Sequence, residues 1–131
     1  METVPMLCVD GILFEKGRLL LIRRACPPYK GEWCLPGGFV LYGESTEEAV
    51  VREFEEETGL KTRVMRLVGV YSDPERDPIG HKVSVCYLVK RTGGRECKSR
   101  ETKEITFFDL KKLPRLGFDH EKMIRDALKR K

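Results

Sequence analysis

The sequence lacks the features that mark membrane-spanning, secreted and zinc-binding proteins. None of its hydrophobic runs is long enough to cross a bilayer, and its first residues lack the basic start and continuous apolar run of a secretory signal. Its five cysteines are odd in number and include no C-x-x-C pair, which argues against a disulfide framework and against a zinc site. We therefore expect a cytoplasmic protein that does not associate with a membrane.

Composition and charge favour one folded domain and a ligand that carries phosphate. The 131 residues suit a single domain over 1–131, and a mixture of 40% hydrophobic and 35% charged residues is too apolar for a disordered chain. A net charge of +4 favours a phosphorylated ligand. A nucleic acid is not expected, because the basic residues are interleaved with acidic ones and no aromatic-plus-glycine RNA signature is present. The sequence leaves open whether the protein is a monomer or a homodimer.

Apolar runs and turn residues predict strands around one central helix. We expect a hairpin over 6–14 and 18–22, a short strand at 33–35, two strands at 61–71 and 82–89, and a last strand at 104–108. Ser45 or Thr46 can cap a helix that runs to about Thr58, where Gly59 supplies a left-handed stop. A closing amphipathic helix is expected over 119–130. This order of elements predicts a mixed α/β sandwich rather than alternating βαβ units.

The central helix carries a strip of carboxylates. At about 100° per residue, Glu53, Glu56 and Glu57 fall within one arc, next to the apolar arc of Val50 and Phe54. Carboxylates at these spacings repel one another unless a cation lies among them. Oxygen ligands at the margin of the core, facing a glycine-rich loop, are those that magnesium prefers. Taken alone, the helix is also compatible with a solvated acidic face, because glutamate is a strong helix former.

A wider pattern resembles the signature of the Nudix hydrolase family, G-x5-E-x7-R-E-U-x-E-E-x-G-U, in which U is an apolar residue. Every fixed position is matched between Gly38 and Leu60, and the preceding segment 33–38 resembles the usual lead-in. The resemblance implies a Nudix-type α/β/α sandwich around a mixed sheet and a pyrophosphohydrolase activity. The matching residues are Gly38, Glu44, Arg52, Glu53, Phe54, Glu56, Glu57, Gly59 and Leu60.

The resemblance also implies a metal site and its supports. Magnesium, or manganese as a substitute, would be bound by the three helix glutamates and by the carbonyl of Gly37 or Gly38. Arg52 would orient Glu53, and Glu44 would support the loop. On this basis the expected metal-binding residues are Gly37, Glu53, Glu56, Glu57 and Glu101.

The general base is less tightly specified by the resemblance. Members of the family use either a helix glutamate such as Glu53 or a glutamate on a later loop. The later candidates are Glu96, Glu101 and Glu104. Glu101 ranks first, because it lies six residues before Phe107, where similar members carry a metal-binding or catalytic acid before an aromatic strand residue, and Glu104 ranks second. The expected catalytic residues are therefore Glu53, Arg52 and Glu101.

Residues outside the signature bear on the substrate. ADP-ribose pyrophosphatases carry a proline about fifteen residues after the signature, and Pro74 stands fifteen residues after Gly59, which favours cleavage of ADP-ribose to AMP and ribose 5-phosphate. Charged side chains at the end of a strand opposite the signature can hold phosphate or ribose oxygens, and an aromatic ring can stack on adenine. The expected substrate-binding residues are Arg23, Arg24, Tyr71 and Pro74.

Three other functions use the same signature. A diadenosine polyphosphate hydrolase and a pyrophosphatase for oxidised nucleoside triphosphates would differ only in the loops that shape the cleft. A nucleotide-sensing module would keep the fold and bind without turnover. Loss of a metal carboxylate would favour the sensing module, whereas all three helix glutamates and Arg52 are present.

Overall fold

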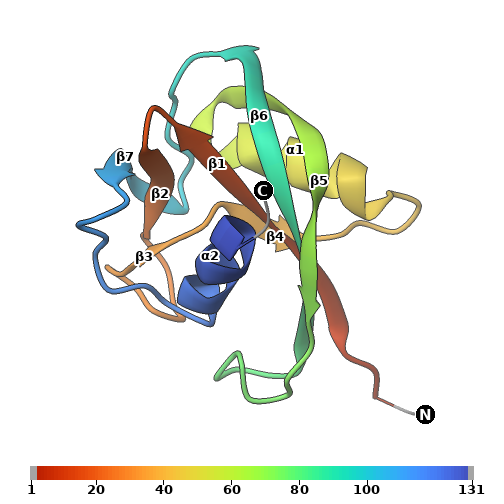
Figure 1. The fold of residues 1–131 in the computed structure, drawn as a ribbon. Helices are drawn as coiled ribbons and strands as arrows, with labels where there is room; N and C mark the ends of the chain where they lie inside the picture. Colours follow the sequence, from red (N-terminus) through yellow and green to blue (C-terminus); the bar gives the residue numbers. More distant parts are fainter. Residues whose placement is uncertain (1–2, 130–131) are drawn as a thin grey trace.

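Seven strands and two helices make up the protein in a computed structural model, which describes residues 3–129 (Figure 1). The helices are α1 (Thr46–Thr58) and α2 (His120–Lys129). The strands are β1 (Met6–Glu15), β2 (Arg18–Arg24), β3 (Trp33–Cys34), β4 (Gly37–Phe39), β5 (Leu60–Tyr71), β6 (Lys82–Gly94) and β7 (Thr102–Asp109).

The strands form one mixed sheet with β1 at its centre. The order is β3-β2-β1-β6-β5, with β4 paired to β1 and β7 paired to β2. Strands β1 and β6 run parallel over eight paired residues, from Met6 with Lys82 to Leu13 with Val89, whereas the other pairs are antiparallel. The predicted mixed sheet is confirmed.

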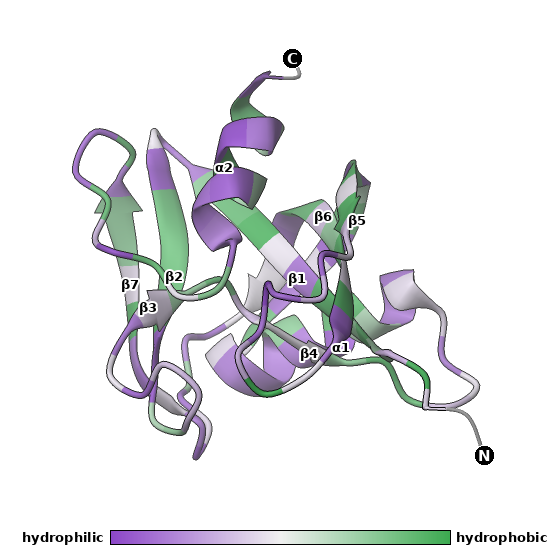
Figure 2. Cartoon of the chain, turned by 90° about the horizontal axis from the view of Figure 1, so that it is seen from below, coloured by the Kyte–Doolittle hydropathy of each residue, from purple (hydrophilic) through white to green (hydrophobic). Residues whose placement is uncertain are grey.

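Alternating side chains bury both faces of the sheet. In β2, Leu20 and Ile22 pack into a core with α1, while Leu19 and Leu21 pack into a second core with α2. Figure 1 shows the two helices on opposite sides of the sheet, and Figure 2 shows apolar residues along the strands between hydrophilic helix surfaces. The predicted α/β/α sandwich is therefore confirmed.

The strand β4 was not expected, because the sequence at 36–38 predicts a break. It forms because Gly37 and Gly38 pair closely with Asp10 and Val9. A Cβ on Gly37 would lie 2.1 Å from the carbonyl oxygen of Val9, so only glycine permits this pairing. The other strands extend beyond their predicted ends by up to five residues, as β6 does to Gly94, except β3, which ends at Cys34, one residue before its predicted end. The predicted end of α2 at residue 130 lies outside the described residues.

Within residues 3–129, no helix is both long enough and apolar enough to span a membrane.

Candidate active site

Local hydrogen bonds fix where α1 begins and ends. The Ser45 hydroxyl accepts the Glu48 N–H at 3.1 Å, and the Glu48 carboxylate accepts the Ser45 N–H at 2.9 Å. This reciprocal pair satisfies two N–H groups that a helix start leaves free. Gly59 ends the helix with a φ of 78°. Because both ends are fixed, the helix presents Phe54 to the core and Glu57 to β4.

Glu57 and Glu53 lie against the glycine backbone of β4. Glu57 is 6% exposed, and its Oε1 accepts the N–H of Gly37 at 2.7 Å. A Cβ on Gly38 would lie 2.1 Å from Oε2 of Glu53, so the carboxylate fills the space that a side chain would take. Gly38 thus leaves room for Glu53 beside the strand, and Gly37 holds Glu57 through its backbone N–H.

Arg52 ties the loop before α1 to these carboxylates. Its Nε donates to Glu44 at 2.6 Å, and its Nη2 donates to the carbonyl oxygen of Phe39 at 2.9 Å. Its Nη1 lies 3.2 Å from Glu56 and 3.4 Å from Glu53. The hydrogen bond from Arg52 lowers the pKa of Glu44. The planar guanidinium, with several donors in fixed directions, suits this role of holding a loop and carboxylates together.

Burial makes the inner carboxylates costly to ionise. Desolvation raises the pKa of Glu53 to about 7, and it raises the pKa of Glu57 well above its ordinary value. Nearby carboxylates, including that of Glu101, raise both pKa values further. These two groups would therefore gain most from a cation beside them.

The carboxylates of α1 offer oxygen atoms that suit a divalent cation, although their side chains are not arranged as a complete metal site. Within residues 3–129, no group of three or more His, Cys, Asp or Glu side chains is arranged to hold a metal ion. The Glu56 side chain is 57% exposed and turned to Arg52. Glu53 and Glu57 nevertheless supply the hard oxygen atoms that magnesium prefers, and the hydrogen bond to Glu57 comes from an uncharged N–H.

A cleft of about 590 Å³ opens beside these carboxylates. Its walls come from β1, β4 and α1, from the segment between β5 and β6, from the segment between β6 and β7, and from the start of α2. Positive side chains are spread around it, so a diphosphate bound inside would meet opposite charge. They are Arg24, Arg76, Lys82 and Arg100.

Comparison with known protein families matches the model described as "NUDIX domain" to residues 4–127. The chain belongs to the Nudix family. A curated ADP-ribose pyrophosphatase of Methanocaldococcus jannaschii is 50% identical over 125 residues, which cover 95% of this chain and 74% of that protein.

Solved structures of Nudix proteins share the fold. A MutT/nudix family protein from Enterococcus faecalis is 32% identical with a TM-score of 0.88, covering 99% of this chain and 63% of that one. The Nudix domain of Shewanella oneidensis NrtR, solved with ADP ribose, is 27% identical with a TM-score of 0.86, covering 98% of this chain and 90% of that one.

The cleft contains six of the ten residues that the sequence indicated for catalysis, metal binding or substrate binding. The helix glutamates line it, and so do Gly37, Arg24 and Glu101. The backbone N–H of Ala25 donates to the carbonyl oxygen of Glu101 at 3.0 Å, which anchors the later loop beside the cleft. Arg52 stands behind the cleft wall and contacts Glu53 from there.

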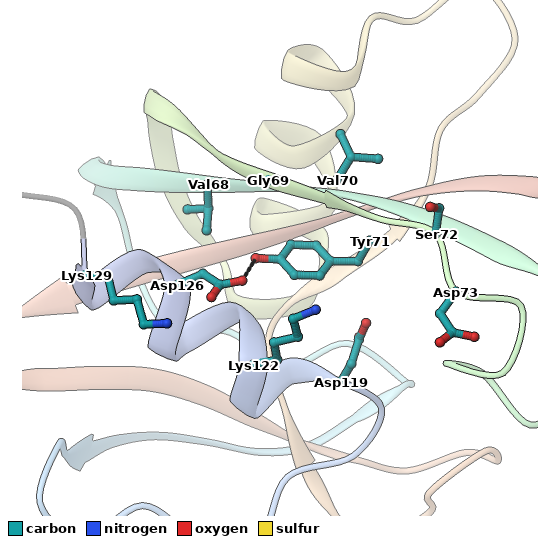
Figure 3. Close-up of a pocket in the computed structure, with 10 residues that line it drawn as sticks. All are labelled: Val68, Gly69, Val70, Tyr71, Ser72, Asp73, Asp119, Lys122, Asp126 and Lys129. Atoms are coloured by element: carbon teal, nitrogen blue, oxygen red, sulfur yellow. Dashed lines mark hydrogen bonds between the residues drawn. The ribbon is translucent and has the colours of Figure 1, made fainter.

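Three of the expected substrate-binding residues are not brought to the cleft. Tyr71 lines a separate depression of about 540 Å³ on the α2 side, where its hydroxyl donates to Asp126 at 2.7 Å (Figure 3). Arg23 donates to the carbonyl oxygen of Gly31 and to Glu104. Pro74 lines neither cavity. The alternation of strand side chains puts Tyr71 on the α2 face of the sheet, opposite the helix that carries the glutamates.

The Nudix cleft also contains residues that sequence reasoning missed. Asp10, Arg76, Phe118 and His120 all line it, although 110 residues separate the first from the last. One signal was available for Asp10, since a lone carboxylate inside an apolar strand needs buried partners. Nothing local marked Phe118, which has a φ of 56° and lies under the guanidinium of Arg24 at 5.3 Å.

Proposed function

We propose that this chain is a magnesium-dependent pyrophosphohydrolase that cleaves ADP-ribose to AMP and ribose 5-phosphate. The observation that carries the proposal is the pair of desolvated carboxylates, Glu53 and Glu57, held against the Gly37–Gly38 backbone at the wall of a cleft that four basic side chains also line. Nudix hydrolases use divalent metal ions, and these carboxylates supply suitable ligands. The choice of ADP-ribose is supported by the identity to the M. jannaschii enzyme.

In this proposal the residues that hold the metal are Glu53, Glu56, Glu57 and Glu101, with the carbonyl oxygen of Gly37. When bound, magnesium neutralises charge on the diphosphate oxygens and acidifies the attacking water. Glu56 would turn from Arg52 toward the cleft, a change that its exposure permits. Arg52 keeps the 39–44 segment and Glu53 in place.

The reaction adds one water across the P–O–P anhydride. The water oxygen joins one phosphorus, and the bridging oxygen leaves with the other. A carboxylate accepts the proton from the water, and we assign this role to Glu53 or Glu101. Both carboxylates line the cleft, Glu53 from α1 and Glu101 from the segment between β6 and β7.

The lining of the cleft combines an aromatic ring with polar side chains. Toward the start of α2, Phe118 presents a ring that Tyr29 braces edge-on at 4.8 Å and that Arg24 covers. Toward β4, Lys82 pairs with the buried Asp77 at 3.0 Å. An aromatic ring suits contact with a nucleobase and polar side chains suit a sugar, and ADP-ribose contains both groups.

Other substrates compete with ADP-ribose within this proposal. Diadenosine polyphosphates and oxidised nucleoside triphosphates contain the same anhydride, and a nucleotide-sensing module would bind without turnover. We further propose that the protein is one domain over 1–131 and acts in the cytoplasm on a small nucleotide, without nucleic acid or membrane, as a monomer or homodimer.

A substrate panel tests the proposal. The purified protein is incubated with Mg²⁺ and each of ADP-ribose, diadenosine tetraphosphate, 8-oxo-dGTP, NADH and a nucleotide sugar, and the products are separated. We expect the highest kcat/KM for ADP-ribose, with AMP and ribose 5-phosphate as products. Glu53→Gln serves as a matched variant, because it keeps the side-chain volume and should abolish turnover. Higher kcat/KM for another compound would reject the substrate, and tight ADP-ribose binding without products would favour the sensing module.

A further inference from the structure

A buried chain of polar side chains leads from α2 to the backbone of the candidate metal site. His120 is 3% exposed and Asp10 is 7% exposed, and both line the cleft. The N–H of Leu35 donates to Nδ1 of His120 at 3.0 Å. The other ring nitrogen, Nε2, lies 3.3 Å from Oδ1 of Asp10. The imidazole therefore spans the distance between a backbone N–H and a carboxylate.

The partners of the ring define its tautomer. Because Nδ1 accepts a hydrogen bond from an N–H, it bears no proton, and the ring proton is on Nε2, which faces Asp10. Asp10 is itself held in place by two neighbours. The hydroxyl of Ser84 donates to its Oδ2, and Nη2 of Arg76 lies 4.0 Å from the same oxygen. The ring thus has one orientation and one donor direction.

Asp10 also touches the metal-site backbone directly. Gly37 is its partner in the pairing of β1 with β4, and a Cβ on Gly37 would lie 2.5 Å from Oδ1 of Asp10. The same Gly37 donates its N–H to Glu57 at 2.7 Å. The segment 35–37 is therefore held at its start by His120 and at its end by Asp10 and Glu57.

We propose that His120 and Asp10 are positioning residues. They fix the position of the Leu35–Gly37 backbone, and through it they set the affinity of the site for metal. The inference rests on the metal site of the proposed function. Neither side chain is assigned as a metal ligand. Groups that orient metal ligands in this indirect way typically change metal affinity by about 10- to 100-fold when they are removed.

Metal binding without substrate tests this inference. Metal-free protein is titrated with Mn²⁺, and free Mn²⁺ is measured by electron paramagnetic resonance. We expect His120→Leu to weaken Mn²⁺ binding by about tenfold or more, because the Leu35 N–H loses its acceptor and the backbone is released. His120→Gln, which keeps one acceptor and one donor, should recover part of the affinity.

A matched control lies on the same helix. Asp126 accepts a hydrogen bond from Tyr71 in the separate depression (Figure 3) and does not line the cleft, so Asp126→Ala removes a contact of α2 without touching segment 35–37. We expect Mn²⁺ affinity in this variant to equal that of the wild type. Thermal unfolding of both variants shows how much each has lost in stability.

The outcomes separate this inference from the proposed function. Weaker binding in His120→Leu, with unchanged binding in Asp126→Ala, supports the positioning role. Equal affinities in all proteins, or equal losses in both variants, would overturn it. Absence of Mn²⁺ binding by the wild type would overturn the metal site itself. If His120→Leu does not fold, Asp10→Ala gives the same test, because it removes the acceptor that faces Nε2 of His120.

Discussion

Replacing Gly38 by alanine tests whether the position of Glu53 determines the reaction rate. The added Cβ would lie 2.1 Å from Oε2 of Glu53 and 2.3 Å from its Cδ, far below the 3.0 Å that Cβ contacts in proteins respect. The carboxylate is the movable partner, so it must shift by about 1 Å. Because Gly38 has no left-handed φ, the backbone itself accepts alanine.

The displacement of Glu53 sets the expected magnitude. A misplacement of about 1 Å in a catalytic group can lower a rate by about 100-fold, which corresponds to about 2.7 kcal/mol of transition-state stabilisation. We therefore expect Gly38→Ala to reduce kcat/KM for ADP-ribose by about 100-fold, while the melting temperature changes little. Steady-state kinetics and thermal unfolding measure the two quantities.

Two other glycines serve as comparisons. A Cβ on Gly37 would lie 2.1 Å from the backbone oxygen of Val9, which cannot swing aside, so Gly37→Ala should lower stability as well as activity. A Cβ on Gly93 meets nothing within 4 Å, so Gly93→Ala should change neither. Wild-type kinetics in Gly38→Ala would refute the reasoning, because the carboxylate would then tolerate displacement.

Four further predictions concern charge, the contacts of Arg52 and the thiols. Glu57→Gln keeps an acceptor for the Gly37 N–H without a buried charge, so its metal-free melting temperature at pH 7 should equal or exceed that of the wild type. Its turnover should fall at least about 100-fold, and Mg²⁺ should no longer raise its melting temperature. Arg52→Met should lower kcat by about 10- to 100-fold, because Arg52 connects the loop before α1 to the carboxylates. Arg52→Lys should restore little of the lost kcat, because lysine cannot reach both the loop and the carboxylates. A wild-type kcat in Arg52→Met would exclude this role of Arg52. A maleimide at pH 8 should label the exposed Cys26 and Cys97 first and leave Cys34 unlabelled, because burial raises the pKa of Cys34 to about 12. Since the raised pKa keeps this thiol protonated in the folded protein, its contribution to stability should fall as pH rises from 9.0 to about 12, which unfolding by denaturant at several pH values would detect.

Local features of the sequence were sufficient to predict much of the fold. The span of α1 follows from a serine cap and a glycine stop, and the predicted helix matches the observed Thr46–Thr58. Strands such as β5 follow from their apolar and β-branched residues. The convergence of Glu53 and Glu57 follows from helical geometry, because both positions fall on one arc.

Contacts between residues that are far apart in the sequence could not be predicted from local sequence patterns. The parallel pairing of β1 with β6 brings Asp10 next to Ser84, which stands 74 positions away. The fold of the chain then adds His120 from α2, so side chains from three separate elements meet at Asp10 beside the cleft. No spacing rule links such residues, because their proximity depends on the order of strands in the sheet.

The substrate residues show the same limit. Arg23 and Arg24 are adjacent in sequence, but successive strand residues point to opposite faces, and only Arg24 lines the cleft. In the segment after β5, Arg76 reaches the cleft although Pro74 does not, because Arg76 is drawn inward by its two hydrogen bonds to Asp119. The sequence therefore indicated which segment reaches the cleft. Which residue of that segment lines the cleft depends on the tertiary structure.

Product analysis of ADP-ribose hydrolysis tests the central claim most directly. The purified protein is incubated with ADP-ribose, with and without Mg²⁺, and the phosphorus-containing products are quantified by ³¹P nuclear magnetic resonance. The account predicts AMP and ribose 5-phosphate in equal amounts, formed only when Mg²⁺ is present. Intact ADP-ribose after incubation with Mg²⁺-loaded protein, or products formed equally well without a divalent metal, would contradict it.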